Sequence, residues 1–436
     1  MKELFNRWLP QGSTVRNVFT LASGASLGQL AVVLVSPLLT RIYTPEEFGV
    51  LAVYASLLAV ISTISGGRYE LAIPLPKTDG SAVNILALVV LCVFFTTALA
   101  TIIIVLFGAK ISIPSMDPFF WLLPFGILLT GIYQAFNYWA IRRHSFNRIA
   151  MTKMQQGVGG AAAQVGLGLA HLGPLGLITG HVIGQGAGVV ALIRGAYRED
   201  FLLISRIRWQ RIKHCARRYK RFPKYTIGSA LANSSSTMLP VIFFAFLFSS
   251  EVAGVYMLAY STLHTPLRLI GNSVGQVFHA KAVEARRQGN LQMLVVTTIT
   301  NLLRLSVIPF VVTIIFAPDI FATLFGDGWR TAGIYAQYMA PWLVLQFCVS
   351  SVSQVVTVLE KQAGLLVSQI IFLITRIGVI LVASNLGLGS IEVIASFSIV
   401  SAVLYLGHFL WICYLLNIGL KQIVKTFAVS FWFGKR

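Results

Sequence analysis

Three arginines lie deep within long apolar stretches of the sequence: Arg268 in HTPLRLIG, Arg304 in NLLRLSV and Arg376 in LITRIGV. An arginine inside the hydrocarbon of a bilayer is costly, so it normally faces a water-filled cavity. No Asp or Glu lies comparably deep in an apolar stretch. Embedded cations without embedded carboxylates favour an anionic ligand, because a guanidinium group donates to two phosphate oxygens at once.

His264 lies one helical turn before Arg268, and Pro266 between them can kink a helix. Arg16 and Arg41 flank the first apolar stretch at its two ends, where each is either an interfacial anchor or part of the same cavity.

Snorkelling, or hydrogen bonds to backbone carbonyls, would also explain Arg304 and Arg376. The pattern predicts neither catalytic residues nor a metal site. The candidate anion-binding residues are Arg41, Arg268, Arg16, Arg304, Arg376 and His264.

Composition indicates that membrane helices hold these side chains. The chain has 436 residues, of which 56% are hydrophobic and 11% charged, and its mean hydropathy is +0.78. About a quarter of the residues of a soluble domain are charged. The apolar stretches reach the length of about 20 residues that a helical span needs and lack the alternation of barrel strands. We therefore predict an all-α polytopic membrane protein.

We expect twelve transmembrane helices. They are predicted at residues 17–40, 48–66, 81–107, 118–140, 149–170, 174–195, 225–248, 252–278, 293–316, 331–358, 363–384 and 391–417.

The positive charges predict the orientation of these helices. The net charge is +20, and 28 of the 34 Lys and Arg residues fall near helix ends on the side of the N-terminus. Only Arg41, Lys110 and Arg330 fall on the other side. By the positive-inside rule both termini are cytoplasmic. The basic excess then faces anionic lipid headgroups and requires no nucleic-acid partner.

The connection at residues 197–224 is the longest and the most basic. Trp209, Ile212, Ala216 and Tyr219 recur at helical spacing among nine Lys and Arg residues. This pattern predicts an amphipathic helix on the inner leaflet, with a docking site for a cytosolic enzyme as the alternative. The predicted organisation is an N-terminal six-helix bundle at 1–196, this linker, a C-terminal six-helix bundle at 225–418 and a basic cytoplasmic tail at 419–436.

The two halves resemble each other. At an offset of 205 residues, Glu46 falls on Glu251 and Gly49 on Gly254. Six helices per half return the chain to its starting side, so the halves are parallel repeats related by a pseudo-two-fold axis. Proteins built in this way usually carry substrate between the halves by alternating access. The acids near Pro45 begin the second helix, where they stabilise its N-terminus.

Enzyme motifs are missing from the sequence, including Walker A, HExxH and GxSxG. The glycine-rich runs at 157–170 and 184–191 lie inside predicted spans, where small residues let helices approach closely. The sequence therefore predicts a protein that is not an enzyme.

The residues LLTRIYTPEEFGVLAVYASL (38–57) and RYELAIPLPK (68–77) resemble the start of bacterial oligosaccharide flippases of the Wzx type. These belong to the polysaccharide transporter family, within the MOP superfamily that includes MATE exporters and lipid II flippases. The helix number, the two bundles and the basic midpoint loop are similar along the whole chain.

The resemblance implies a flippase of the bacterial inner membrane, serving polysaccharide synthesis such as that of O-antigen and lipopolysaccharide. Its cargo would be an undecaprenyl-pyrophosphate-linked oligosaccharide, moved from the cytoplasmic to the periplasmic leaflet through a cationic cavity. Arg41, Arg268 and Arg16 fit such a lining, and Arg68 and Glu70 match the family's motif near the cytoplasmic gate. Membrane lipids, a glycan polymerase and glycosyltransferases are the implied partners.

Two other functions stay open at this stage. A MATE-like drug/cation antiporter would carry carboxylates inside its N-terminal bundle, where Glu70 is the only candidate. A membrane enzyme acting on the same glycolipid, a polymerase or a ligase, would need a larger external loop. No cofactor is expected, and H⁺ or Na⁺ is the coupling ion that a transporter of this kind would use.

Overall fold

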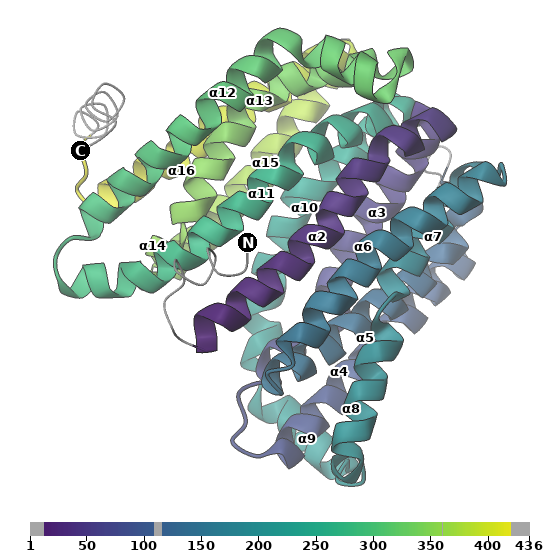
Figure 1. The fold of residues 1–436 in the computed structure, drawn as a ribbon, viewed down its shortest axis with the longest axis vertical. Helices are drawn as coiled ribbons and strands as arrows, with labels where there is room; N and C mark the ends of the chain where they lie inside the picture. Colours follow the sequence, from purple (N-terminus) through teal and green to yellow (C-terminus); the bar gives the residue numbers. More distant parts are fainter. Residues whose placement is uncertain (1–12, 109–115, 360, 420–436) are drawn as a thin grey trace, which may run out of the picture. The chain divides into compact units, whose positions relative to one another are not determined.

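A computed structural model describes residues 13–108, 116–359 and 361–419 of the chain, and the described elements are helices (Figure 1). Each of the twelve predicted segments is helical. Nine helical stretches of the described part are long and apolar enough to cross a membrane. The helices at the predicted spans 149–170 and 252–278 are not among them, and the described apolar part of the span at 17–40 is a shorter helix, Leu27–Ile42. The chain divides into two compact units, Met1–Ser234 (unit 1) and Ser235–Arg436 (unit 2).

Unit 1 holds ten complete described elements and the start of α10. They are α2 (Ser13–Ile42), α3 (Pro45–Ser65), η1 (Tyr69–Ala72), α4 (Asp79–Phe107), η2 (Asp117–Leu122), α5 (Leu123–Arg142), α6 (Phe146–Leu169), α7 (Gly173–Gly186), α8 (Val189–Ile204), α9 (Trp209–Arg218) and α10 (Arg221–Leu247).

Unit 2 begins inside α10 and repeats the helical organisation. Its further elements are α11 (Ser250–Arg287), α12 (Leu291–Phe325), η3 (Asp327–Trp329), α13 (Arg330–Val352), α14 (Gln354–Val358), α15 (Gln362–Asn385) and α16 (Ser390–Leu415).

Glycines bring α2 and α6 into close contact within unit 1, where the two helices lie side by side (Figure 1). A Cβ atom on Gly157 would collide with the carbonyl of Gly28, so neither helix tolerates a side chain there. The glycine-rich run of α6 therefore serves helix packing, as the sequence predicted.

The second helix of each half begins with the same cap. Thr44 Oγ1 accepts a hydrogen bond from the Glu47 amide at 3.3 Å, and the Glu47 carboxylate accepts from the Thr44 amide at 2.8 Å. At an offset of 205 residues, Ser249 Oγ accepts from the Val252 amide at 3.2 Å. The acids of this turn thus stabilise the start of α3, and the shared cap supports an internal duplication.

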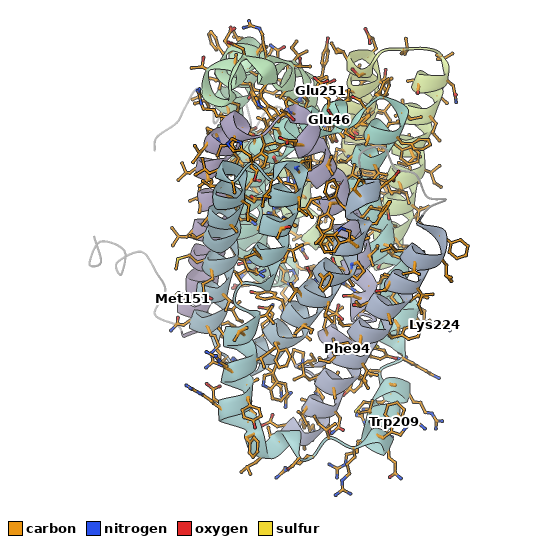
Figure 2. All side chains as sticks on the ribbon, turned by 90° about the vertical axis from the view of Figure 1, so that its right-hand side faces the viewer. Glu46, Phe94, Met151, Trp209, Lys224 and Glu251 are labelled. Atoms are coloured by element: carbon orange, nitrogen blue, oxygen red, sulfur yellow. The ribbon has the colours of Figure 1, made fainter. Side chains whose placement is uncertain are left out.

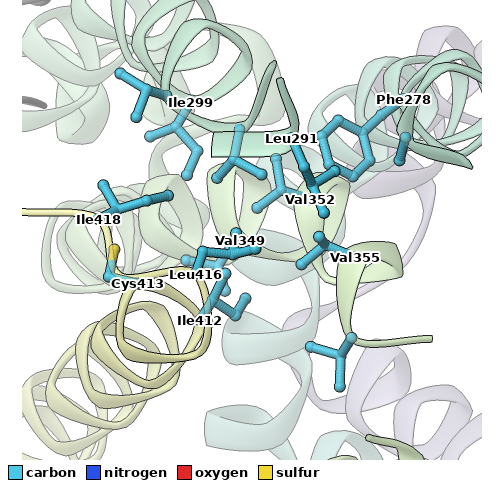
Figure 3. Packing of buried hydrophobic residues seen from close by; sticks show 14 residues of the cluster. Phe278, Leu291, Ile299, Val349, Val352, Val355, Ile412, Cys413, Leu416 and Ile418 are labelled. Carbon is cyan, nitrogen blue, oxygen red and sulfur yellow. The ribbon is translucent and has the colours of Figure 1, made fainter. Parts of the chain in front are cut away.

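An apolar cluster around Val352 of α13 packs helices of unit 2 together (Figure 3). Phe278 of α11, Val296 of α12 and Ile412 of α16 pack against it, and each is almost fully buried. Every methyl group removed from such a cluster loses both its transfer free energy and its packing contacts. The cluster fixes the ends of four helices of unit 2 relative to one another.

The amphipathic helix predicted between the halves is α9, and part of its apolar face packs against protein. Ile212 and Cys215 are buried against unit 1, and α9 packs on α4. Tyr69 donates a hydrogen bond to the carbonyl of Ala216 at 3.2 Å. Trp209 is 60% exposed. Protein therefore covers Ile212 and Cys215, and the placement of α9 on the inner leaflet stays a prediction.

Two predicted helices are interrupted. The segment 174–195 breaks between α7 and α8 at Gly188, whose φ of 85° lies in the left-handed region. A Cβ on Gly188 would also collide with the side chain of Thr152. The segment 331–358 breaks at Ser353, between α13 and α14. Hydropathy is continuous across both breaks, so it could not reveal them.

Candidate substrate-binding residues

Arg376, in the middle of α15, is the most deeply buried of the candidate cations whose side chains the structure describes, with 2% of its surface exposed. Its Nε donates a hydrogen bond to Ser401 Oγ on α16 at 3.1 Å. Its Nη1 donates to the carbonyl of Ser236 on α10 at 3.3 Å. One guanidinium group therefore links three helices of unit 2.

Four aromatic rings surround this guanidinium group. Its central carbon lies 5.2 Å from the ring centroid of Trp342, 5.5 Å from those of Phe372 and Tyr405, and 5.6 Å from that of Phe397. We call Arg376, these four rings, Ser236 and Ser401 the Arg376 cage. No carboxylate of the described residues forms an ion pair with Arg376.

The cage offsets the cost of the buried charge. An arginine at the centre of an apolar helix costs about 3 kcal/mol on insertion scales. Each desolvated ring face contributes roughly 0.5 to 2 kcal/mol, and each hydrogen bond from a charged donor roughly 1.5 to 3 kcal/mol. Nη2 of Arg376 is buried and has no hydrogen-bond partner in the described part of the chain.

His264 connects to this cage through stacked rings. Its imidazole lies parallel to the ring of Tyr260, with centroids 4.6 Å apart and planes within 14°. Tyr260 stacks on Trp342 at 6.0 Å, and Trp342 stacks on Tyr405 at 6.2 Å. Sequence patterns gave no sign of this column, because its rings come from three helices far apart in the chain.

Arg268, one turn beyond His264 on α11, is exposed. It lies in the middle of a continuous helix that contains Pro266. No carboxylate of the described residues pairs with Arg268. Arg304 on α12 is half-buried. Of the unit 2 candidates, His264 and Arg376 share one aromatic cluster, and Arg268 offers an accessible guanidinium group.

The unit 1 candidates lie apart from one another. Arg41 is exposed in the last turn of α2. Arg68 and Glu70 follow the other end of α3, so the length of that helix separates them from Arg41 by about 30 Å. The side chain of Arg16 falls outside the described residues, although its backbone begins α2.

Arg68 and Glu70 form a buried pair in the turn between α3 and α4. Arg68 Nη1 lies 3.7 Å from Glu70 Oε1, and the Glu70 side chain is 3% exposed. Burial raises the pKa of Glu70, while its own backbone hydrogen bond and Arg68 oppose the rise. Arg68 has a φ of 61°, a left-handed conformation that is strained for any residue with a Cβ.

A charge network holds the same end of unit 1. Arg142 donates to Asp79 at 2.8 and 3.0 Å and to the carbonyl of Pro76 at 2.9 Å. Arg143 donates to Asp79 and Asp200, and Trp139 Nε1 donates to Asp200 at 3.0 Å. In the sequence these arginines are recognisable only as loop charges. Their acidic partners lie more than fifty residues away, so spacing gave no signal.

Comparison with known proteins places this arrangement in a family. The sequence profile of the family described as "Polysaccharide biosynthesis protein" matches residues 38–333. No curated protein matches the chain.

Solved transporter structures share its fold. An inward-facing multidrug resistance MATE family transporter of the MOP superfamily is 16% identical, with a TM-score of 0.63 over 95% of this chain and 97% of that chain. The lipid II flippase MurJ in an inward closed conformation is 13% identical, with a TM-score of 0.68 over 96% and 91%. A MOP superfamily transporter from Pyrococcus furiosus is 14% identical, with a TM-score of 0.54 over 92% and 95%.

These likenesses establish the fold. The chain is a multi-pass membrane protein with the all-α, two-bundle architecture of MATE-like transporters, as the sequence predicted.

Proposed function

The chain belongs to the polysaccharide biosynthesis protein family, and from this membership we propose that it is a flippase for lipid-linked oligosaccharides. Its substrate is an undecaprenyl-pyrophosphate-linked repeat unit, moved from the cytoplasmic to the periplasmic leaflet of a bacterial inner membrane by alternating access. A charged, sugar-bearing headgroup cannot cross about 30 Å of hydrocarbon unaided. A protein in this family with a transporter fold supplies the missing path.

The accessible guanidinium of Arg268 carries the proposal. An exposed arginine in the middle of a long helix, without a described carboxylate partner, is a candidate binding group for an anion. Arg268 contacts the pyrophosphate, and Arg41, Arg16 and Arg304 are further contacts for phosphate or sugar hydroxyls. The lipid tail stays in the bilayer while the headgroup moves. Arg68 and Glu70 form part of the gate at the cytoplasmic end.

A MATE-like drug/cation antiporter is the second candidate, because MATE transporters share the fold. Such a protein needs a carboxylate inside the N-terminal bundle for cation exchange. The described acids of unit 1 all lie at or near helix ends or in the short turns: Glu46, Glu47, Glu70, Asp79, Asp117, Glu199 and Asp200. This placement favours an anionic lipid headgroup over a cationic drug.

Deletion of the gene in the organism that encodes it tests the proposal. The expected result is loss of a surface polysaccharide, with its lipid-linked repeat unit accumulating on the cytoplasmic leaflet and export restored by the intact gene. Unchanged surface glycan together with new sensitivity to cationic drugs would support the antiporter instead.

A further inference from the structure

The binding partners of Arg376 are already supplied by the protein. Two of its three nitrogens donate to Ser401 Oγ and to the carbonyl of Ser236. Four rings cover the remaining directions at 5.2 to 5.6 Å. With 2% of its surface exposed, its guanidinium group is not available to a headgroup that moves through the protein.

The surroundings of Arg376 have the composition of a cation-binding site. Aromatic faces attract a cation through their quadrupoles, and oxygens accept hydrogen bonds from the N–H groups of a guanidinium ion. The ring of Trp342 also stacks on Tyr260 and Tyr405, and Gln346 donates to the Tyr405 hydroxyl at 2.8 Å. These contacts hold the rings in place independently of Arg376.

We propose that the rings and oxygens of the Arg376 cage form an internal guanidinium-binding site, which the chain fills with the side chain of Arg376. Arg376 is thus a positioning residue. The group links α15 to α10 and α16, and through Trp342 to α13. It thereby sets the packing of the helices in unit 2. Truncation of the Arg376 side chain leaves the aromatic rings and the two accepting oxygens without a cation, and a small guanidinium ion is the ligand that fits this site.

Thermal unfolding of the purified full-length protein in detergent tests the proposal. Arg376→Ala is expected to lower the unfolding midpoint by several degrees. Millimolar methylguanidinium then restores most of the loss. Tetramethylammonium, a cation without N–H donors, restores little, because it can use the rings but cannot donate to Ser401 or Ser236. Sodium chloride at the same ionic strength is the salt control.

Arg287→Ala is the matched control, because Arg287 is an exposed arginine in the last turn of α11. Neither the wild-type protein nor this control gains stability from methylguanidinium. A wild-type midpoint for Arg376→Ala, or equal gains for all three proteins, would contradict the proposal.

Ser401→Ala provides a second test if Arg376→Ala yields no folded protein. It removes only the oxygen that accepts from Nε and leaves the charge and the rings in place. A lower midpoint with an unchanged apparent affinity for a lipid-linked pyrophosphate supports a positioning role. An unchanged midpoint with weakened affinity would assign Arg376 to substrate binding and overturn the inference.

Discussion

Glu70 Oε1 lies 3.7 Å from Arg68 Nη1 in the turn between α3 and α4, and Glu70 Oε2 is buried without a hydrogen-bond partner in the described structure. The pair is thus an incomplete salt bridge. The Glu70 carboxylate interacts electrostatically with Tyr138 and Cys92. Gly66 permits the approach, because a Cβ there would fall 2.6 Å from Oε2. A carboxylate held in this way resists ionisation.

Glu70→Gln is expected to remove a pH dependence of stability. Because burial raises the pKa of Glu70 above its ordinary value of 4.5, the folded protein holds this proton more tightly than the unfolded chain. As pH rises from 4.5 through the raised pKa, the wild-type protein therefore loses stability relative to Glu70→Gln. Above the raised pKa, the difference in stability between the two proteins is constant. Thermal midpoints of both proteins between about pH 4 and 8 measure the difference.

Glu284→Gln is the control for this experiment, since Glu284 is an exposed carboxylate on α11. Its curve should run parallel to that of the wild-type protein. Parallel curves for Glu70→Gln as well would show that Glu70 titrates normally.

Asp200→Asn is expected to destabilise unit 1. The Asp200 side chain is 7% exposed and accepts hydrogen bonds at 3.0 Å from both Arg143 and Trp139. Loss of its charge leaves Arg143 with Asp79 alone. The expected loss is about 2 kcal/mol, less than for a fully buried pair because Arg143 keeps contact with water. A fall in the thermal midpoint measures it.

Glu199→Gln is the neighbouring control. Glu199 pairs with Arg148, but its side chain is 48% exposed, so the expected loss is below about 1 kcal/mol. Equal effects of the two substitutions would show that burial does not strengthen the Asp200 pair.

Hydropathy predicted the positions of all twelve helical segments, because the period and length of apolar stretches depend on local sequence alone. Some helices end at other residues than hydropathy predicted. The predicted span ended at Phe278, but α11 continues to Arg287. The polar residues after Phe278 also form helix, although they end the apolar stretch. At the break, Gly188 lies so close to Thr152 of α6 that a Cβ would not fit, and no local window contains this contact.

The candidate site shows the same division between local and distant information. Arg376 was recognisable as an embedded charge, but its rings on α13 and α16 meet it only in the folded chain. Likewise, α9 was recognisable as amphipathic, whereas the protein surface that buries Ile212 was not. Sequence identified the candidate residues, and tertiary packing decided which of them are accessible.

Cysteine labelling tests the proposed orientation. Glu46, at the start of α3, and Trp209, at the start of α9, lie at opposite ends of unit 1 (Figure 2). We expect a membrane-impermeant thiol reagent to label Glu46→Cys in intact cells. Lys213→Cys, on α9, should react only after the membrane is opened, because the basic end faces the cytoplasm. Labelling with the reverse pattern would invert the topology and move the proposed gate to the outside.

Arg268→Ala is expected to abolish glycan export, because the pyrophosphate loses its guanidinium partner. Arg268→Lys keeps the charge but not the bidentate geometry, so part of the export should persist. Surface glycan measured at matched expression provides the readout. Arg287→Ala, an exposed arginine at the end of the same helix, should export normally. Normal export by Arg268→Ala would remove Arg268 from the binding site.

The most direct test of the central claim is flipping by the purified protein in vesicles that carry a labelled undecaprenyl-pyrophosphate-linked oligosaccharide in the inner leaflet. An external glycosidase measures how fast the sugar reaches the outer leaflet. We predict that the wild-type protein exposes the oligosaccharide much faster than protein-free vesicles do, and that Arg268→Ala does not. Equal rates with and without the wild-type protein, under every ion gradient applied, would contradict the assignment as a flippase.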